Sequence, residues 1–184
     1  SNVIRLRLKN PFETATPWQR ERAQRDLVTA AIPPGDHLIH HSDVDEFPHP
    51  QVFSINIDHP WHLSQELYYY NLLNRVDHFW NLPFITKTLV QPSWMRHEPF
   101  PTIDQGGWHF SWFGDPSQRA LKLKAFAHQE LNTPQALTHI TLATPHDPWE
   151  REQCPWTLLE RPTVPERLYS CLARYYDKIL LEGR

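Results

Sequence analysis

The sequence predicts an α/β fold with a mixed sheet flanked by helices, and three observations support this. Segments rich in aromatic and β-branched residues alternate with segments of helical periodicity. Two of the helical segments begin at clear capping signals. The chain also holds 18 Pro but only 5 Gly, which favours stiff connections between elements. Strands that alternate with helices are typical of layered α/β folds.

The first helix is expected to begin at Pro17, with Thr16 as its cap and Gln19 completing a capping box. Pro33-Pro34-Gly35 should end it. Its expected apolar face consists of Ala23, Leu27, Val28 and Ala31. A short strand over residues 37–41 then runs into the acidic segment 42–48, so carboxylates follow directly after a strand.

Further strands are expected over residues 67–73, 84–90 and 108–113, with an irregular segment over 92–107. Asp115 should cap a helix that extends to about residue 131, and residues 164–181 should form another helix. The sequence has no internal repeat and no linker long enough to separate two domains. We therefore expect one domain over residues 1–184.

Composition excludes several classes of protein. Hydrophobic residues make up 40% of 184 residues, which is enough to fold one core. No apolar run approaches the roughly 18–20 residues that would cross a bilayer, so no membrane segment is expected. A net charge of −3 gives no electrostatic reason to bind nucleic acid. Cys154 and Cys171 are too few for a zinc site or a disulfide framework, although one disulfide is compatible with them.

The most informative short motif is Asp43-Val44-Asp45, at the end of the strand over 37–41. Ligands of α/β sheets bind at the carboxyl ends of strands. Two carboxylates there can hold Mg²⁺ or Mn²⁺ against a diphosphate, whose charge the cation neutralises. A D-x-D triplet is also common in solvated turns, so the motif alone has little specificity.

Five ordered segments are more specific: W-Q-R-E-R-A-Q-R-D at 18–26, S-D-V-D-E-F-P at 42–48, Y-Y-Y-N at 68–71, G-G-W-H-F-S-W-F at 106–113 and K-A-F-A-H-Q-E-L-N at 124–132. Together they resemble glycosyltransferase family 17, which includes the enzyme that adds bisecting N-acetylglucosamine to N-glycans and many bacterial relatives. The resemblance covers residues 17–135, with a weaker echo over 169–181. It implies a GT-A-like nucleotide-sugar fold, and a bacterial member would be cytoplasmic.

The resemblance also implies an inverting transfer of N-acetylglucosamine from UDP-N-acetylglucosamine to a carbohydrate or other hydroxyl acceptor. The implied metal, Mn²⁺ or Mg²⁺, would be held by the D-x-D aspartates, with Asp43 near the ribose or the metal and Asp45 as the direct ligand. Glu46 would either support these ligands or face solvent.

Other residues near these motifs are candidates on chemical grounds. Gly106-Gly107 would allow close approach to a ligand, Trp108 would stack on a sugar, and His109 would complete the metal site begun by Asp45. Trp112 is expected in the core. Arg20, Arg22 and Arg25 of the first helix could supply a guanidinium to the diphosphate, and Arg20 and Arg25 are the candidates.

An inverting transfer needs a general base for the acceptor hydroxyl. The carboxylate candidates are Glu98, Asp104 and Glu130, and the sequence does not choose among them. His128 and Glu130 are expected two residues apart on one helix and so on different faces.

In one respect the chain departs from the family. Relatives begin with a strand ahead of the W-Q-R-E helix that helps to hold uridine, and this chain offers only residues 3–8 there. The first strand is thus expected to be missing, which predicts weak donor binding and either self-association through the open sheet edge or a substitute strand from residues 3–8. Two alternative functions are a metal-dependent phosphoester hydrolase and a non-catalytic carbohydrate-binding remnant.

Overall fold

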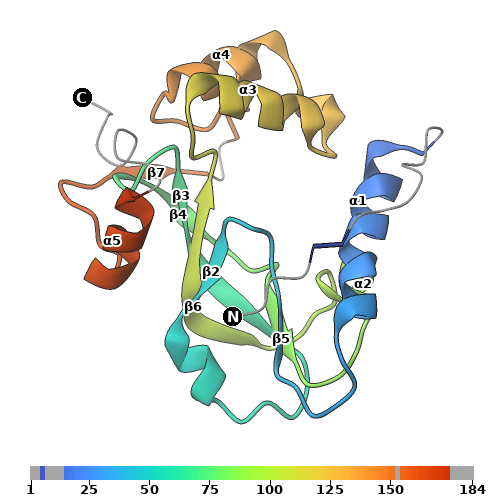
Figure 1. Cartoon of the computed structure of the whole chain (residues 1–184). Coiled ribbons are helices and arrows are strands. Elements are labelled where there is room, and N and C mark those ends of the chain that lie inside the picture. Colours follow the sequence, from blue (N-terminus) through green and yellow to red (C-terminus); the bar gives the residue numbers. More distant parts are fainter. Residues whose placement is uncertain (1–4, 7–14, 152–153, 175–184) are drawn as a thin grey trace.

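The structure, a computed structural model, describes residues 5–6, 15–151 and 154–174. It is a mixed α/β arrangement in which helices flank one curled sheet of seven strands (Figure 1). The strands are β1 (Ile39–His41), β2 (Glu46–Pro48), β3 (Trp61–Tyr69), β4 (Asn74–Trp80), β5 (Phe84–Thr86), β6 (Thr102–Ser111) and β7 (Trp156–Leu158). The α-helices are α1 (Pro17–Leu27), α2 (Pro92–Met95), α3 (Pro116–Ala125), α4 (Pro134–Leu142) and α5 (Glu166–Ala173). Short 3-10 turns are η1 (Val28–Ala31), η2 (Pro50–Ser54) and η3 (Gln129–Leu131).

Strand β3 is the centre of the sheet. It pairs in parallel with β6, and antiparallel with β4 and, near its own start, with β5. The outer strands continue this order, since β1 pairs with β5, β7 with β4 and β2 with β6. The expected mixed sheet is confirmed.

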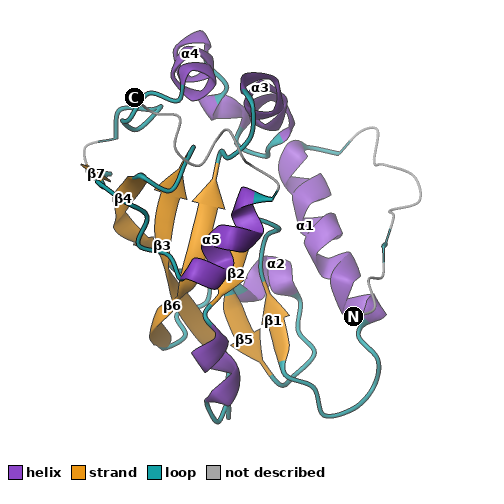
Figure 2. Ribbon diagram, turned by 60° about the vertical axis from the view of Figure 1, so that its left-hand side comes forward, coloured by secondary structure: helices purple, strands orange, loops and turns teal. Residues whose placement is uncertain are grey.

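Residues of β3 and β6 alternate between the two faces of the sheet. Tyr68, Trp108 and Phe110 belong to a hydrophobic cluster that α5 completes through Leu172. Leu67 and Tyr69 belong to another cluster on the opposite face, which α3 and α4 cover through Leu123 and Ile140. Figure 2 shows α5 lying across the sheet while α3 and α4 lie together at one end of it.

The two capping signals are confirmed. Thr16 and Gln19 form a reciprocal capping box at the start of α1, and Asp115 and Gln118 form another at the start of α3. Helix α1 continues into η1 and stops before Pro33-Pro34, as expected. These boundaries depend on contacts within four residues, which the sequence displays directly.

The expected end of α3 is wrong. The helix stops at Ala125, six residues before the predicted end near 131, because Phe126 is extended (φ −74°, ψ 163°). The Gln129 side chain then donates to the carbonyl oxygens of Phe126, at 2.6 Å, and of Lys124, at 3.2 Å. A side-chain donor thus satisfies acceptors that a longer helix would have paired.

Several strand boundaries also differ from expectation. The strand expected over 67–73 is β3, which starts six residues earlier and stops at Tyr69. It stops there because Tyr70 has a positive φ (68°) and the Asn71 side chain accepts hydrogen bonds from the backbone N–H groups of Leu73 and Asn74. The strand expected over 84–90 ends at Thr86, and the segment 92–107 contains α2 and the first half of β6. Strands β2, β4 and β7 and helix α4 were not predicted. The helix expected over 164–181 is α5 as far as Ala173, and residues 175–184 lie outside the described chain.

The glycine pair in β6 has a structural reason that differs from the predicted one. A Cβ on Gly107 (φ 145°) would lie 2.0 Å from the Phe47 carbonyl oxygen of β2, and a Cβ on Gly106 would lie 2.8 Å from the Leu63 Cα of β3. The glycines therefore let three strands approach one another.

Within the described ranges, no helix is long and apolar enough to span a bilayer. The suggested substitute strand over residues 3–8 falls largely outside the described chain, which includes only residues 5–6 of it.

Candidate functional site

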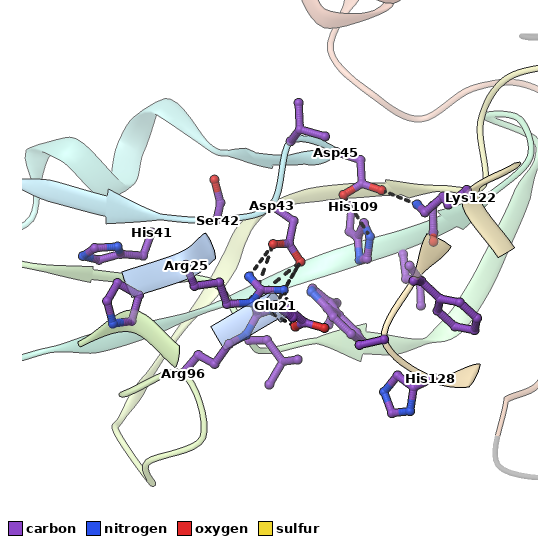
Figure 3. Close-up of a pocket in the computed structure, with 18 of the residues that line it drawn as sticks. Glu21, Arg25, His41, Ser42, Asp43, Asp45, Arg96, His109, Lys122 and His128 are labelled. Carbon is purple, nitrogen blue, oxygen red and sulfur yellow. Dashed lines mark hydrogen bonds and ion pairs between the residues drawn. The ribbon is translucent and has the colours of Figure 1, made fainter. Parts of the chain in front are cut away.

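A pocket of about 800 Å³ lies between helix α1, the turn that joins β1 to β2, and the segment from α3 to η3. Its floor is the sheet face that carries Leu67, Tyr69, His109 and Ser111. Figure 3 shows the charged side chains that meet there. The two aspartates of the D-x-D motif both line this pocket, as the sequence predicted from their position after a strand.

Asp43 is held by two arginines. Arg25 Nη1 and Nη2 donate to its carboxylate, the second at 3.1 Å, and Arg96 lies 3.5 Å away. Burial disfavours the charged carboxylate, but the two guanidinium groups outweigh burial and lower the pKa of Asp43. Asp43 is therefore ionised and has two cationic partners.

Asp45 faces a different pair of groups. Its Oδ2 accepts from Lys122 Nζ at 2.8 Å, and its Oδ1 lies 3.6 Å from His109 Nε2 (Figure 3). Burial again opposes ionisation, and the contacts with His109 and Lys122 overcome it and lower the pKa of Asp45. Asp45 and His109, which were predicted to share a metal ion, are thus neighbours in the structure.

Glu46 lies beneath the turn and does not face solvent, so the solvent-facing alternative is wrong. Its side chain is fully buried, accepts hydrogen bonds from the Asp43 backbone N–H and from Trp80 Nε1, and lies 3.6 Å from Arg96. Burial, followed by the charge of Asp43, raises the pKa of Glu46. It supports the turn from below and has no contact with the pocket.

Helix α1 and the first residue of η1 form one wall of the pocket. The residues that line it follow helical spacing: Trp18, Glu21, Gln24 and Arg25 of α1, and Val28 of η1. This face differs from the predicted apolar face, of which only Val28 lines the pocket. Helix α1 buries none of its residues. Polar contacts attach α1 and the η1 turn that follows it. Asp26 of α1 accepts from the Ser93 backbone N–H (3.0 Å) and hydroxyl (2.8 Å), and the Thr29 hydroxyl of η1 donates to the Val90 carbonyl oxygen (2.9 Å).

The far rim of the pocket holds His128 and Glu130, whose expected separation is wrong. The segment is a 3-10 turn and not a continued helix, so His128 Nδ1 and Glu130 Oε1 lie 2.6 Å apart. The Trp18 ring of α1 meets the His128 ring edge-on, with 4.3 Å between their centres. Only His128 of the pair lines the pocket.

Other candidates lie elsewhere. Glu98 and Asp104 do not line the pocket, and Asp104 is exposed on the first half of β6. Trp108 points to the opposite face of the sheet from His109, because neighbouring residues on a strand alternate, and it packs in the α5 cluster. Arg20 bonds to the Ala15 carbonyl oxygen, away from the pocket. Trp112 is buried as expected, although its ring also lines the pocket.

Residues that the sequence did not single out complete the site. Arg96 reaches the turn from the end of α2 and is 6% exposed, and Lys122 reaches it from α3. His40 and His41 of β1 also line the pocket, and burial lowers the pKa of each to about 4, so both are neutral at pH 7. Their only sequence signal was the run of polar residues at a strand end.

No group of three or more His, Cys, Asp or Glu side chains in the described parts of the chain is arranged to hold a metal ion. Asp45 and His109 are the pair whose donor atoms suit Mn²⁺, and the Nδ1 of His109 is buried without a partner. Asp43 fits less well, because arginines already bind its carboxylate. A cation held here would thus have two protein ligands and would need further oxygen donors from a bound ligand.

Comparisons of the chain with models of protein families, with curated proteins and with solved structures gave no match in any of the three.

Proposed function

We propose that the chain is a metal-dependent glycosyltransferase with a GT-A-like fold, which moves N-acetylglucosamine from UDP-N-acetylglucosamine to a hydroxyl of a carbohydrate acceptor. The observation that carries the proposal is the meeting of Asp43-x-Asp45 with Arg25, Arg96 and Lys122 in one pocket of about 800 Å³. Carboxylates suit a divalent cation, and guanidinium and ammonium groups suit phosphate oxygens. Both are needed where a nucleoside diphosphate departs.

The pocket residues fit distinct roles in such a transfer. Arg25 and Arg96 pair with the phosphate oxygens, because two fixed guanidinium groups stabilise the charge that develops on the leaving diphosphate. Asp45 and His109 would hold a divalent cation, which when bound would neutralise more of that charge. Glu46 keeps the turn in place through its bond to the Asp43 backbone N–H.

The acceptor hydroxyl needs a base, and His128 is the best placed group. Of the three predicted carboxylates, only Glu130 approaches the pocket, and it does so by bonding His128 Nδ1. That bond orients the ring and leaves Nε2 to accept a proton. As the acceptor oxygen bonds to the anomeric carbon, the bond from that carbon to the diphosphate breaks, and the hydroxyl proton passes to His128.

Calorimetric titration with UDP, with and without Mn²⁺, tests the proposal. We expect UDP binding that depends on Mn²⁺ and on Asp45, so that Asp45→Asn abolishes it, whereas Asp36→Asn, the same change at an exposed loop residue, leaves it intact. Release of UDP from UDP-N-acetylglucosamine in the presence of an acceptor glycan should follow the same pattern. Phosphate release without an acceptor would favour a hydrolase instead, and sugar binding without nucleotide binding would favour a carbohydrate-binding protein.

A further inference from the structure

Trp18 lines the rim of the pocket without being part of the hydrophobic core. Helix α1 buries none of its residues, and Trp18 is 39% exposed. Its ring meets that of His128 edge-on, with 4.3 Å between their centres, and the His128 ring contacts that of Phe126 at 6.0 Å. Trp18 therefore extends an aromatic surface across the rim to a position that a ligand can reach.

The polar groups beside Trp18 suit hydroxyls better than phosphates. On α1, Glu21 and Gln24 follow Trp18 at helical spacing, and both line the pocket. Across the rim, His128 Nδ1 lies 2.6 Å from the carboxylate of Glu130. Carboxylates repel phosphate oxygens, whereas carboxylates, an amide and an imidazole can all form hydrogen bonds with hydroxyl groups. This end of the pocket therefore fits a neutral ligand that carries hydroxyls.

The arginine end of the pocket lies further along α1. Arg25 is seven positions after Trp18, about 10 Å along the helix axis. Its guanidinium pairs with Glu21 at 2.9 Å and with Asp43, on the side of the pocket that also holds Arg96. The aromatic end and the arginine end are thus separated by a span that the transferred sugar would occupy.

We propose that Trp18 is the platform for the acceptor, on which a neutral pyranose ring of gluco configuration stacks beside His128. The ring substituents of such a sugar are equatorial, so its faces carry C–H groups that pack on a flat indole while its hydroxyls reach the polar groups of the rim. The stacking role expected of Trp108, which is buried in the α5 cluster, thus falls to Trp18. Calling this sugar the acceptor rests on the proposed function, whereas its binding needs neither nucleotide nor metal.

Titration of the full chain with cellobiose and with N,N′-diacetylchitobiose, without nucleotide or metal, tests this by calorimetry or saturation-transfer NMR. We expect Trp18→Ala to weaken disaccharide binding about tenfold, because the indole face is lost, and Trp18→Phe to weaken it less. Trp94→Ala is the matched control, since Trp94 of α2 is 61% exposed and does not line the pocket. Circular dichroism checks that each variant folds.

Equal disaccharide affinities of the parent and Trp18→Ala, or no binding of either disaccharide, would overturn the inference. An equal loss of UDP affinity in Trp18→Ala would also overturn it, because the indole would then contact the nucleotide. Disaccharide binding that depends on Trp18, in a chain that does not bind UDP, would support the sugar platform and refute the proposed function. UDP binding together with disaccharide binding that is independent of Trp18 would support the proposed function and refute the platform.

Discussion

Glu46→Gln tests whether the buried carboxylate beneath the D-x-D turn holds the site together. The carboxylate accepts from the Asp43 backbone N–H and from Trp80 Nε1, and it is one of two carboxylates near Arg96. An amide has one acceptor oxygen and an NH₂ group, so one of these two donors loses its partner. An unsatisfied buried donor costs about 1–3 kcal/mol, and loss of charge near the buried guanidinium adds to this.

We therefore expect the free energy of unfolding to fall by about 2–3 kcal/mol. The variant no longer buries a charged carboxylate, which offsets part of the loss. For a chain of this length, that change lowers the midpoint of thermal unfolding by about 4–12 °C. Differential scanning calorimetry at pH 7 measures it. The control is Glu160→Gln, the same chemical change at an exposed position. If both variants unfold at the parent temperature, the turn does not depend on Glu46 and the argument is refuted.

Three further predictions concern the sheet, the turn and the rim of the pocket. Gly107→Ala should lower the free energy of unfolding, measured by denaturant titration, by about 3 kcal/mol or more, because the new Cβ would lie 2.0 Å from a backbone carbonyl oxygen. Gly35→Ala is the control and should cost less, because Gly35 has a similar φ but faces only the His37 side chain. The pKa of Asp45 is lowered in the folded chain, so its ionised form contributes stability that is present above the unfolded pKa of 3.8 and is lost as the pH falls below it. In thermal unfolding between pH 5 and about 2, Asp45→Asn should therefore lose less stability than the parent. An equal fall of unfolding temperature with pH in both chains would contradict the ion pairs described. His128→Gln should lower kcat for UDP release by about 10²-fold or more with little change in UDP affinity measured by calorimetry, and an unchanged kcat would exclude it as the base.

Local signals predicted the structure where local contacts decide it. The predicted caps at Thr16 and Asp115 were correct because their donors and acceptors lie within three residues of each other. Strand β4, with the sequence NRVDHFW, was missed because it is half exposed and carries charge, so its strand character depends on pairing with β3 and β7. The length of α3 was overestimated because its stop depends on the side chain of Gln129.

The residues of the candidate site were likewise predicted only where local sequence indicates them. Asp43, Asp45, His109 and Arg25 were predicted from motif and position, and the structure brings them together. Pairing Trp108 with His109 in one site was an avoidable error, because adjacent strand residues face opposite ways. Arg96 and Lys122 were not predictable in this way: Lys122 and Lys124 are alike in sequence, and only the tertiary fold brings one of them to Asp45.

Helix α1 is a wall of the pocket that is less firmly packed than the sheet that forms the floor. A wall that buries no residue can detach from the sheet at lower free energy than the strands that form the floor, so its amides should exchange with solvent earlier than those of β3 and β6. A ligand that contacts both Arg25 and the sheet would join the two parts and protect α1 from this local opening. Part of the binding free energy of such a ligand would then offset the tendency of α1 to open, so its apparent affinity would be lower than for a pocket with fixed walls.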